Sequence, residues 1–242
     1  SGIISIMLNS NELINKVKNY NKFLNPEKLD KAYNFAVNAH KSQKRASGDP
    51  YSVHPIEVAN ILTELKLDSA TITTGLLHDT IEDTNVTYES VKKEFGEEVA
   101  KLVDGVTKLR LIKTKLSGNS ESDTERSDNL RKMLVAMAED IRVVLIKLAD
   151  RLHNMQTLEP LPPNRQIEIA QETLDIYAPL AERIGMQGMK AELEDLAFAE
   201  INPDVRNSII RRLNFLKNRG EDIVDRIINQ LYELLSKEGL IV

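Results

Sequence analysis

The sequence predicts an all-α protein. Over most of the 242 residues, apolar side chains recur three or four positions apart, which is the spacing of one face of a helix. The chain has only 10 glycines, so long stretches contain no helix-weakening residue. No stretch alternates apolar and polar residues for long enough to indicate a strand.

Composition narrows the class of protein further. The net charge of −5 argues against a general nucleic-acid binder or a binder of acidic membranes, because both need a basic surface. The absence of cysteine excludes disulfides, thiolate nucleophiles and cysteine-based zinc sites. No apolar run approaches the roughly 18 residues needed to cross a bilayer, and the apolar start is too short for a convincing signal peptide. We therefore expect a cytoplasmic protein with neither nucleic acid nor a membrane as partner.

Turn-forming residues divide the helical pattern into segments. The predicted helices cover residues 9–24, 27–42, 55 onward, 75–84, 87–95, 99–109, 129–158, 164–184 and 189–200. Pro26 and Pro55 suit the first turn of a helix, where the missing amide hydrogen is not needed. Thr87 is a suitable N-cap, and three prolines between 160 and 163 mark a hard break.

Two later segments differ from the rest in composition. Residues 117–129 contain no large apolar side chain, which predicts a mobile loop and makes it a candidate lid. Residues 129–158 are the most apolar helical segment, with apolar side chains around nearly the whole circumference, so this helix should be central. After Pro203, amphipathic helices are predicted to reach about residue 237 and to pack on the main body or on a partner, so that an oligomer could form through them.

The helix predicted at 75–84 carries the first candidate site. An apolar run leads into His78 and Asp79, and residues four apart on a helix lie one above the other, which pairs His78 with Glu82 and Asp79 with Asp83. Carboxylates this close repel one another, and burying them is costly without a cation. A bound metal would relieve that cost, but a solvated acidic helix end is the simpler explanation of this patch alone, and a metal site needs further ligands from elsewhere in the chain.

Residues elsewhere supply more metal-ligand chemistry. His54 stands at the start of its helix beside a basic loop, where a capping or core role is the alternative. Asp150 lies in the central apolar helix, where a buried carboxylate needs a cation or several donors. His40 lies on an apolar helix face, and we expect it to be structural or to contact a ligand rather than the metal. Two imidazoles and two carboxylates offer four ligands to one divalent ion and leave positions open, a set that suits manganese, iron or zinc.

Three motifs connect these residues to a known family. Residues 47–55 read SGDPYSVHP, residues 78–84 read HDTIEDT, and residues 147–155 read KLADRLHNM. The order H…HD…D resembles the signature of the HD phosphohydrolase superfamily. The longer motifs resemble the hydrolase domain of the Rel/SpoT (p)ppGpp synthetase/hydrolase family, and two similar stretches at 173–181 and 192–198 extend the resemblance over residues 28–200.

The resemblance implies a fold and a division of the chain. The fold would be an HD-domain helical bundle with a C-terminal helical appendage. Residues 1–26 would form an N-terminal helix, residues 27–200 the metal-dependent phosphohydrolase domain, and residues 201–242 the start of a linker to an absent synthetase domain. We therefore expect no transfer of pyrophosphate from ATP.

The resemblance also implies an activity. It would be Mn²⁺-dependent hydrolysis of the 3′-pyrophosphate of guanosine tetraphosphate or pentaphosphate, giving GDP or GTP and pyrophosphate in the stringent response. The implied metal ligands are His54, His78, Asp79 and Asp150. Glu82 and Asp83 would orient the attacking water and take its proton. The alternatives are an HD hydrolase for another nucleotide and a non-catalytic module that binds the alarmone.

The substrate side of the site is implied in the same way. Arg45 would stack on or contact the guanine, and Ser47 would hydrogen-bond its edge. Asn154 and Thr157 would line the nucleoside side, on the helix face that they share with the aspartate ligand four and seven residues earlier. The chain departs from many family members at Ala46, where they carry a lysine, and the loss of that donor could change the preference between the two substrates.

Overall fold

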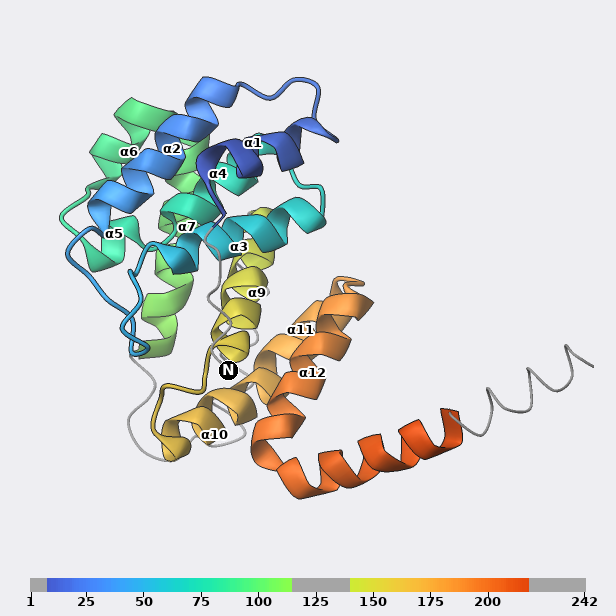
Figure 1. The fold of residues 1–242 in the computed structure, drawn as a ribbon. Coiled ribbons are helices and arrows are strands. Elements are labelled where there is room, and N and C mark those ends of the chain that lie inside the picture. Colours follow the sequence, from blue (N-terminus) through green and yellow to red (C-terminus); the bar gives the residue numbers. More distant parts are fainter. Residues whose placement is uncertain (1–7, 115–139, 218–242) are drawn as a thin grey trace, which may run out of the picture.

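The computed structural model describes residues 8–114 and 140–217 (Figure 1). Its helices are α1 (Ser10–Lys18), α2 (Pro26–Ala39), α3 (Val53–Glu64), α4 (Ser69–Leu77), α5 (Thr80–Asp83), α6 (Tyr88–Phe95), α7 (Glu97–Thr114), α9 (Ile141–Gln156), α10 (Pro163–Glu172), the π-helical turn η1 (Thr173–Tyr177), α11 (Ala178–Arg183) and α12 (Gln187–Ile201). Residues 203–217 are helical as well. Within the described ranges β-pairing is limited to one isolated bridge, between Lys44 and Pro50. The prediction of an all-α fold is confirmed.

The helices form two groups that meet at α9. Figure 1 shows α1 to α7 gathered together, α10 to α12 in a second group, and α9 running between them. Each group has its own apolar core, and α9 contributes to both. Its side chains in the first core are Val143, Ile146 and Ala149. Those in the second core are Val144, Leu148, Leu152 and Met155. The expectation that this helix is central is confirmed. None of the helices in these two ranges is long and apolar enough to cross a membrane.

The start of α9 is defined by a cap. Asp140 accepts a hydrogen bond of 2.9 Å from the backbone of Arg142, so α9 begins at Ile141. Arg142 also forms ion pairs with Asp68 at 3.4 Å and with Glu98 at 2.7 Å. These pairs fasten the start of α9 to the cap of α4 and to α7. Residues 129–139 and the predicted loop and lid at 117–129 lie outside the described residues.

The single helix predicted through residues 75–84 is wrong, because the chain breaks it at His78 and Asp79. Two side chains bind carbonyls of the preceding turn: His78 Nδ1 lies 2.8 Å from the Gly75 carbonyl, and Thr80 Oγ1 donates to the Leu77 carbonyl at 2.6 Å. Side-chain bonds of this kind compete with the regular backbone pattern. α4 therefore ends at Leu77 and the single turn α5 starts at Thr80.

A glycine brings α3 and α4 close together at this point. A Cβ atom at Gly75 would lie 2.7 Å from Leu62 Cδ1 and 3.4 Å from the Cα of Ala59, both in α3. Only a residue without a side chain permits this approach without displacing its neighbours. The close contact sets the distance between His54, near the start of α3, and His78, just after α4.

The predicted helix at 164–184 is present, but it contains a wide turn. α10, η1 and α11 follow one another without a gap, and η1 is π-helical. Pro179 is the second residue of α11, and a proline ring collides with the carbonyl four residues earlier in a regular helix. The wider turn relieves that collision at Asp175. It also presents Tyr177 to α9, where the Arg151 guanidinium lies 4.0 Å from the ring centroid.

Candidate metal centre

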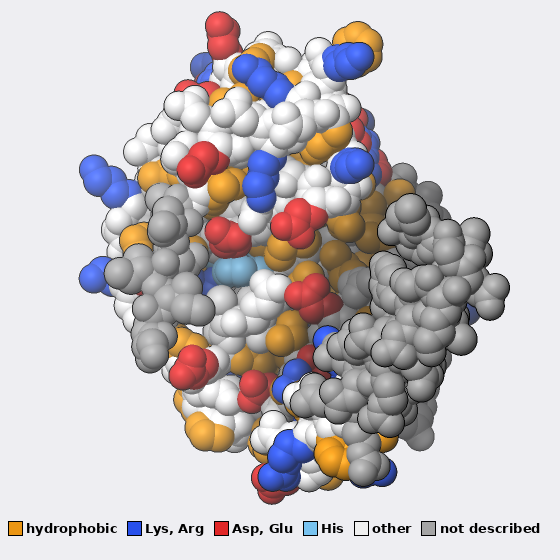
Figure 2. Space-filling model, turned by 45° about the vertical axis from the view of Figure 1, so that its right-hand side comes forward, with side chains coloured by type: hydrophobic (Ala, Val, Ile, Leu, Met, Phe, Trp, Pro, Cys, Tyr) orange, Lys and Arg blue, Asp and Glu red, His pale blue; other side chains and the backbone are white. Residues whose placement is uncertain are grey.

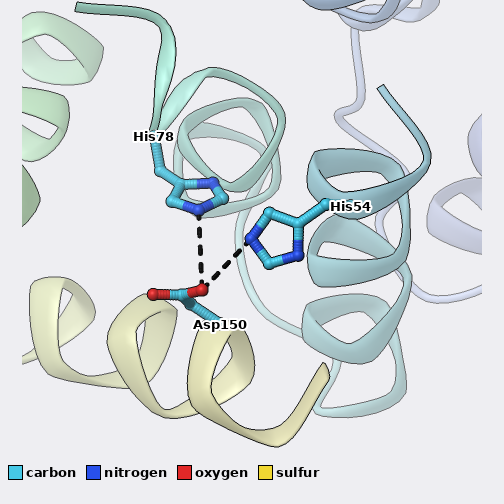
Figure 3. Close-up of side chains that lie close together, drawn as sticks. All are labelled: His54, His78 and Asp150. Carbon is cyan, nitrogen blue, oxygen red and sulfur yellow. Dashed lines mark ion pairs between the residues drawn. The ribbon is translucent and has the colours of Figure 1, made fainter. Parts of the chain in front are cut away.

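Four predicted ligands come from three places that the fold brings together. His54 is the second residue of α3, His78 and Asp79 occupy the break between α4 and α5, and Asp150 lies in the middle of α9. All four side chains are buried. Figure 3 shows His54, His78 and Asp150 pointing toward one another from their separate elements. The sequence separation between the first and the last is bridged by the packing of α9 on α3 and α4.

Three of these residues form a compact group of ligand atoms. His54 Nε2 lies 3.1 Å from Asp150 Oδ1, and His78 Nε2 lies 4.0 Å from the same oxygen. One ligand atom from each residue lies within 4.8 Å of the other two. His78 Nε2 is buried and makes no well-aligned hydrogen bond, although a carboxylate oxygen of Asp79 lies 3.2 Å away. An unsatisfied buried nitrogen is costly in a protein interior, and a cation among these atoms would satisfy it. The donor set therefore fits a divalent metal ion.

Asp79 lies beside this group. Its Oδ1 is 3.2 Å from His78 Nε2 and its Oδ2 is 3.6 Å from His54 Nε2, so different oxygens face the two histidines. Burial alone would raise the pKa of Asp79, but the adjacent His78 and His54 lower it well below its usual range, so the carboxyl stays ionised. The position suits a fourth ligand, and that role stays a prediction.

Asp150 is held by two further side chains of its own helix. Lys147 Nζ lies 2.5 Å from Oδ2, and Asn154 Nδ2 donates to Oδ1 at 2.7 Å. Burial opposes the charged form of Asp150, yet the Lys147 charge and the adjacent His54 and His78 rings hold its pKa well below the usual value. The lysine thus fixes one carboxylate oxygen and leaves the other facing the histidines.

Tyr51 connects the metal group to the predicted catalytic pair. Its hydroxyl lies 2.9 Å from Asp79 Oδ2 and 2.9 Å from Asp83 Oδ2. Burial and the two carboxylates raise the pKa of Tyr51, so it remains a donor. Asp83 and Glu82 belong to α5, the single turn directly after Asp79, and a backbone bond of 2.9 Å from Asp83 to the Asp79 carbonyl keeps the pair close to it. Glu82 is half-buried.

Three of the four predicted substrate residues contact one another beside Asp150, and the fourth does not join them. Arg45 Nη2 donates to Asn154 Oδ1 at 3.2 Å and to Thr157 Oγ1 at 3.4 Å. Asn154 therefore contacts both Asp150 and Arg45, and links the metal side to the substrate side. Ser47 is exposed, and its hydroxyl donates to Asp49 at 2.7 Å.

Histidines other than the predicted ligands also lie in this region. His153 Nδ1 is 2.7 Å from His54 Nδ1, and Arg45 Nη1 is 3.5 Å from the same His153 atom. Burial, followed by the charges of His54 and Arg45, lowers the pKa of His153 to about 3, so its ring is neutral. His40 is buried and stacks on Tyr51 with ring centroids 4.7 Å apart, which agrees with the expected structural role. Figure 2 shows histidine atoms reaching the surface on one face, between acidic and apolar side chains.

Sequence reasoning assigned no role to Tyr51, Lys147 or His153. The last two lie three residues before and three residues after Asp150, the spacing that places them on its helix face. That spacing was available in the sequence and could have identified them. Tyr51 is in the basic loop, and only the folded chain brings it to the carboxylates.

Comparison with known proteins places this site in a family. The model of the HD domain family matches residues 32–187. Among similar curated proteins, GTP pyrophosphokinase rsh of Brucella melitensis is 49% identical over 97% of this chain and 30% of its own length. GTP pyrophosphokinase of Myxococcus xanthus is 50% identical over 88% of the chain and 28% of its own length. The bifunctional (p)ppGpp synthase/hydrolase SpoT of Escherichia coli K12 is 42% identical over 88% of the chain and 30% of its own length.

A solved structure agrees with these relatives. It is described as a metazoan ortholog of SpoT that hydrolyses ppGpp, and it superimposes with a TM-score of 0.55 at 25% identity, over 72% of this chain and 96% of its own. The present chain spans about 30% of the length of the curated relatives named first. The match of the family model over residues 32–187, joined to the H…HD…D order at the buried site, means that the chain belongs to the HD domain family and has its relatives among the Rel/SpoT enzymes.

Proposed function

We propose that this chain is a Mn²⁺-dependent guanosine-3′,5′-bis(diphosphate) 3′-pyrophosphohydrolase, which degrades (p)ppGpp to GDP or GTP and pyrophosphate. A relative from Escherichia coli O157:H7, 42% identical over 214 residues, carries that name. The observation that carries the proposal is the buried group of His54, His78 and Asp150, with Asp79 beside it and Arg45 close by.

In this proposal, the four predicted residues hold one metal ion. They are His54, His78, Asp79 and Asp150. Two carboxylates roughly cancel the charge of a divalent cation, and a mixed nitrogen and oxygen set suits manganese. When bound, the ion would polarise a phosphate oxygen and lower the pKa of a coordinated water.

The chain's own residues supply the proton chemistry. Hydrolysis adds the oxygen of water to the phosphorus next to the ribose, breaks the bond to the ribose 3′-oxygen, and releases pyrophosphate. Glu82 and Asp83 would orient the water and accept the proton that it loses, and the 3′-oxygen gains one to become a hydroxyl. Tyr51 would hold Asp83 in place through the hydroxyl bond described above.

The substrate side would be formed by the residues around Arg45. Its guanidinium can stack on a guanine, and Asn154 and Thr157 hold it at the end of α9. Ser47 would reach the edge of the base from the exposed part of the same loop. Asn154 touches both Arg45 and Asp150, so a base held by Arg45 would lie at a fixed distance from the metal ligands.

The remaining expectations follow from the same proposal. Residues 27–200 would be the catalytic unit, acting in the cytoplasm, and residues 201–242 an extension toward further domains or another subunit. In residues 203–217 several apolar side chains are about half exposed, which supports a contact role for this segment. They are Val205, Ile209, Leu213, Phe215 and Leu216.

The decisive assay is metal-dependent release of pyrophosphate from ppGpp by the purified chain. We expect turnover with Mn²⁺, none with EDTA, and none for Asp79→Ala. Asp204→Asn is the matched control, because this exposed carboxylate lies in the helical segment after α12 and should leave turnover unchanged. A chain that is inert toward ppGpp but hydrolyses another nucleotide in a panel would refute the substrate assignment.

A second pair of variants separates an enzyme from a binding module. Glu82→Gln and Asp83→Asn keep the size of each side chain and remove its ability to accept a proton at neutral pH. An enzyme should lose turnover in both while still binding ppGpp. Unchanged turnover in the double variant would contradict the assigned catalytic pair. If the unsubstituted chain bound ppGpp but did not hydrolyse it, the chain would be a non-catalytic alarmone-binding module.

A further inference from the structure

Two buried histidine rings meet through the same kind of nitrogen. His54 Nδ1 and His153 Nδ1 lie 2.7 Å apart, with ring centroids 4.9 Å apart and the planes tilted by 38°. Their side chains are 3% and 6% exposed. Two nitrogens at this distance must share one hydrogen, so one ring donates and the other accepts.

The other nitrogen of His54 decides the direction. His54 Nε2 faces Asp150 Oδ1 in the candidate metal group, and a metal ligand must offer a lone pair there. A neutral ring with a free Nε2 carries its proton on Nδ1, so His54 donates and His153 accepts. With the proton on Nε2 instead, His54 would donate to Asp150 and could not bind a cation.

The contact between Arg45 and His153 supports the same assignment, in which His54 donates and His153 accepts. Its Nη1 lies 3.5 Å from His153 Nδ1, and a guanidinium offers only donors. A lone pair on His153 Nδ1 suits both neighbours, whereas a hydrogen there would face a donor. His153 therefore carries its proton on Nε2.

The tautomer of His78, the second histidine of the candidate metal group, follows from a similar contact. His78 Nδ1 lies 2.8 Å from the Gly75 carbonyl, which can only accept. The proton of His78 is therefore on Nδ1, and its Nε2 offers a lone pair to the metal group. A backbone carbonyl orients one histidine and a second histidine orients the other.

We propose that His153 is a positioning residue, which accepts the Nδ1 hydrogen of His54 and so keeps His54 in the tautomer and orientation that metal binding requires. The proposal rests on the metal site of the proposed function and adds a residue to it. Because His153 also contacts Arg45, its ring connects the proposed metal ligand His54 to the proposed guanine-binding arginine. Residues that orient a metal-binding histidine usually contribute about 10-fold to 100-fold in metal affinity.

The test compares two substitutions that differ in one property. In His153→Asn the amide oxygen can occupy the place of Nδ1 and accept the hydrogen, whereas His153→Leu fills similar space without an acceptor. Mn²⁺ affinity is measured without nucleotide, from the electron paramagnetic resonance signal of free Mn²⁺ during titration. We expect the leucine variant to bind Mn²⁺ about 10-fold to 100-fold more weakly, and the asparagine variant to stay within a few-fold of wild type.

A spectroscopic measurement on the wild-type protein needs no variant. Long-range proton–nitrogen correlation of ¹⁵N-histidine reports which ring nitrogen carries the proton, and it is recorded with diamagnetic Zn²⁺ bound, because Mn²⁺ broadens the signals of nearby nuclei. We expect a protonated Nδ1 in His54 and a protonated Nε2 in His153.

The outcomes separate this inference from the proposed function. Wild-type affinity for Mn²⁺ in the leucine variant, equal losses in both variants, or a protonated Nδ1 in His153 would each overturn the positioning role and leave the metal site standing. Failure of the wild-type chain to bind Mn²⁺ would overturn the proposed function and this inference together.

Discussion

Replacing Lys147 by methionine measures how strongly the site depends on a buried charge pair. The lysine Nζ lies 2.5 Å from Asp150 Oδ2, and the two residues are 8% and 7% exposed. Methionine keeps the apolar stem and removes the charge. Breaking a buried pair by removing one partner usually costs about 3–5 kcal/mol. Asp150 keeps its hydrogen bond from Asn154 and its contact with His54, so we expect the lower end of that range.

The loss is large enough to see in a melting curve. For a chain of 150–250 residues each kcal/mol shifts the midpoint by about 2–4 °C, so we expect Lys147→Met to melt about 6–12 °C below wild type in EDTA. With saturating Mn²⁺ the difference should shrink, because a cation at Asp150 Oδ1 would balance the carboxylate in place of the lysine. Lys190→Met is the control, since Lys190 pairs with the largely exposed Glu182 and its removal should change little.

Two results would refute the reasoning. A loss below about 1 kcal/mol in EDTA would mean that the pair is solvated, because ordinary surface changes have effects of that size or less. The double variant Lys147→Met with Asp150→Asn removes both charges and should be more stable than Lys147→Met alone. Strict additivity of the two single effects would show that the residues are not coupled.

Three further predictions address neighbouring features. Tyr51→Phe removes the hydroxyl shared by two carboxylates, and we expect kcat to fall about 10-fold to 100-fold with little change in KM, because such a bond contributes about 1.5–3 kcal/mol. Gly75→Ala places a Cβ 2.7 Å from Leu62 Cδ1, and urea denaturation should show a loss of about 1–3 kcal/mol. Burial lowers the pKa of His153 from 6.5 to about 3, so below pH 6.5 the unfolded chain binds a proton that the folded chain does not. Stability should therefore decrease as the pH is lowered from 6.5 toward about 3, by up to about 1.4 kcal/mol per pH unit more than in His153→Asn.

Each of these has a matched comparison. Unchanged kcat in Tyr51→Phe would mean that the hydroxyl does not orient the catalytic carboxylate. Gly188→Ala is the control for Gly75→Ala, because a Cβ at Gly188 meets nothing within 4 Å. Equal destabilisation by both substitutions would argue against crowding between α3 and α4. The same slope of stability against pH in wild type and His153→Asn would show that His153 is not the group that titrates on unfolding.

Local patterns in the sequence were sufficient for the main features of the fold. Helical periodicity predicts most segments, and the apolar side chains around nearly the whole circumference of residues 141–152 predict that α9 is central, as the two cores confirm. Thr87 caps α6 as its residue type suggests. These features depend on short-range spacing, which a single sequence displays directly.

The features that sequence reasoning missed depend on contacts between distant residues or on competition for backbone carbonyls. The break after α4 forms because His78 and Thr80 bind carbonyls of the preceding turn, and helical periodicity carries no sign of that choice. The His54–His153 contact spans 99 residues, so neither motif alone reveals it. The composition of the candidate site could be predicted, while its internal hydrogen bonding required the fold.

The position of α9 in both apolar cores has a consequence for how the protein comes apart. One face of α9 completes the core of α1 to α7, and another completes the core of α10 to α12. If either group of helices separated from α9, its apolar core would be exposed to solvent. We therefore expect the described parts of the chain to unfold in one cooperative transition. The carboxylate that α9 supplies to the histidines would then disappear in the same step as the farthest turn of α12.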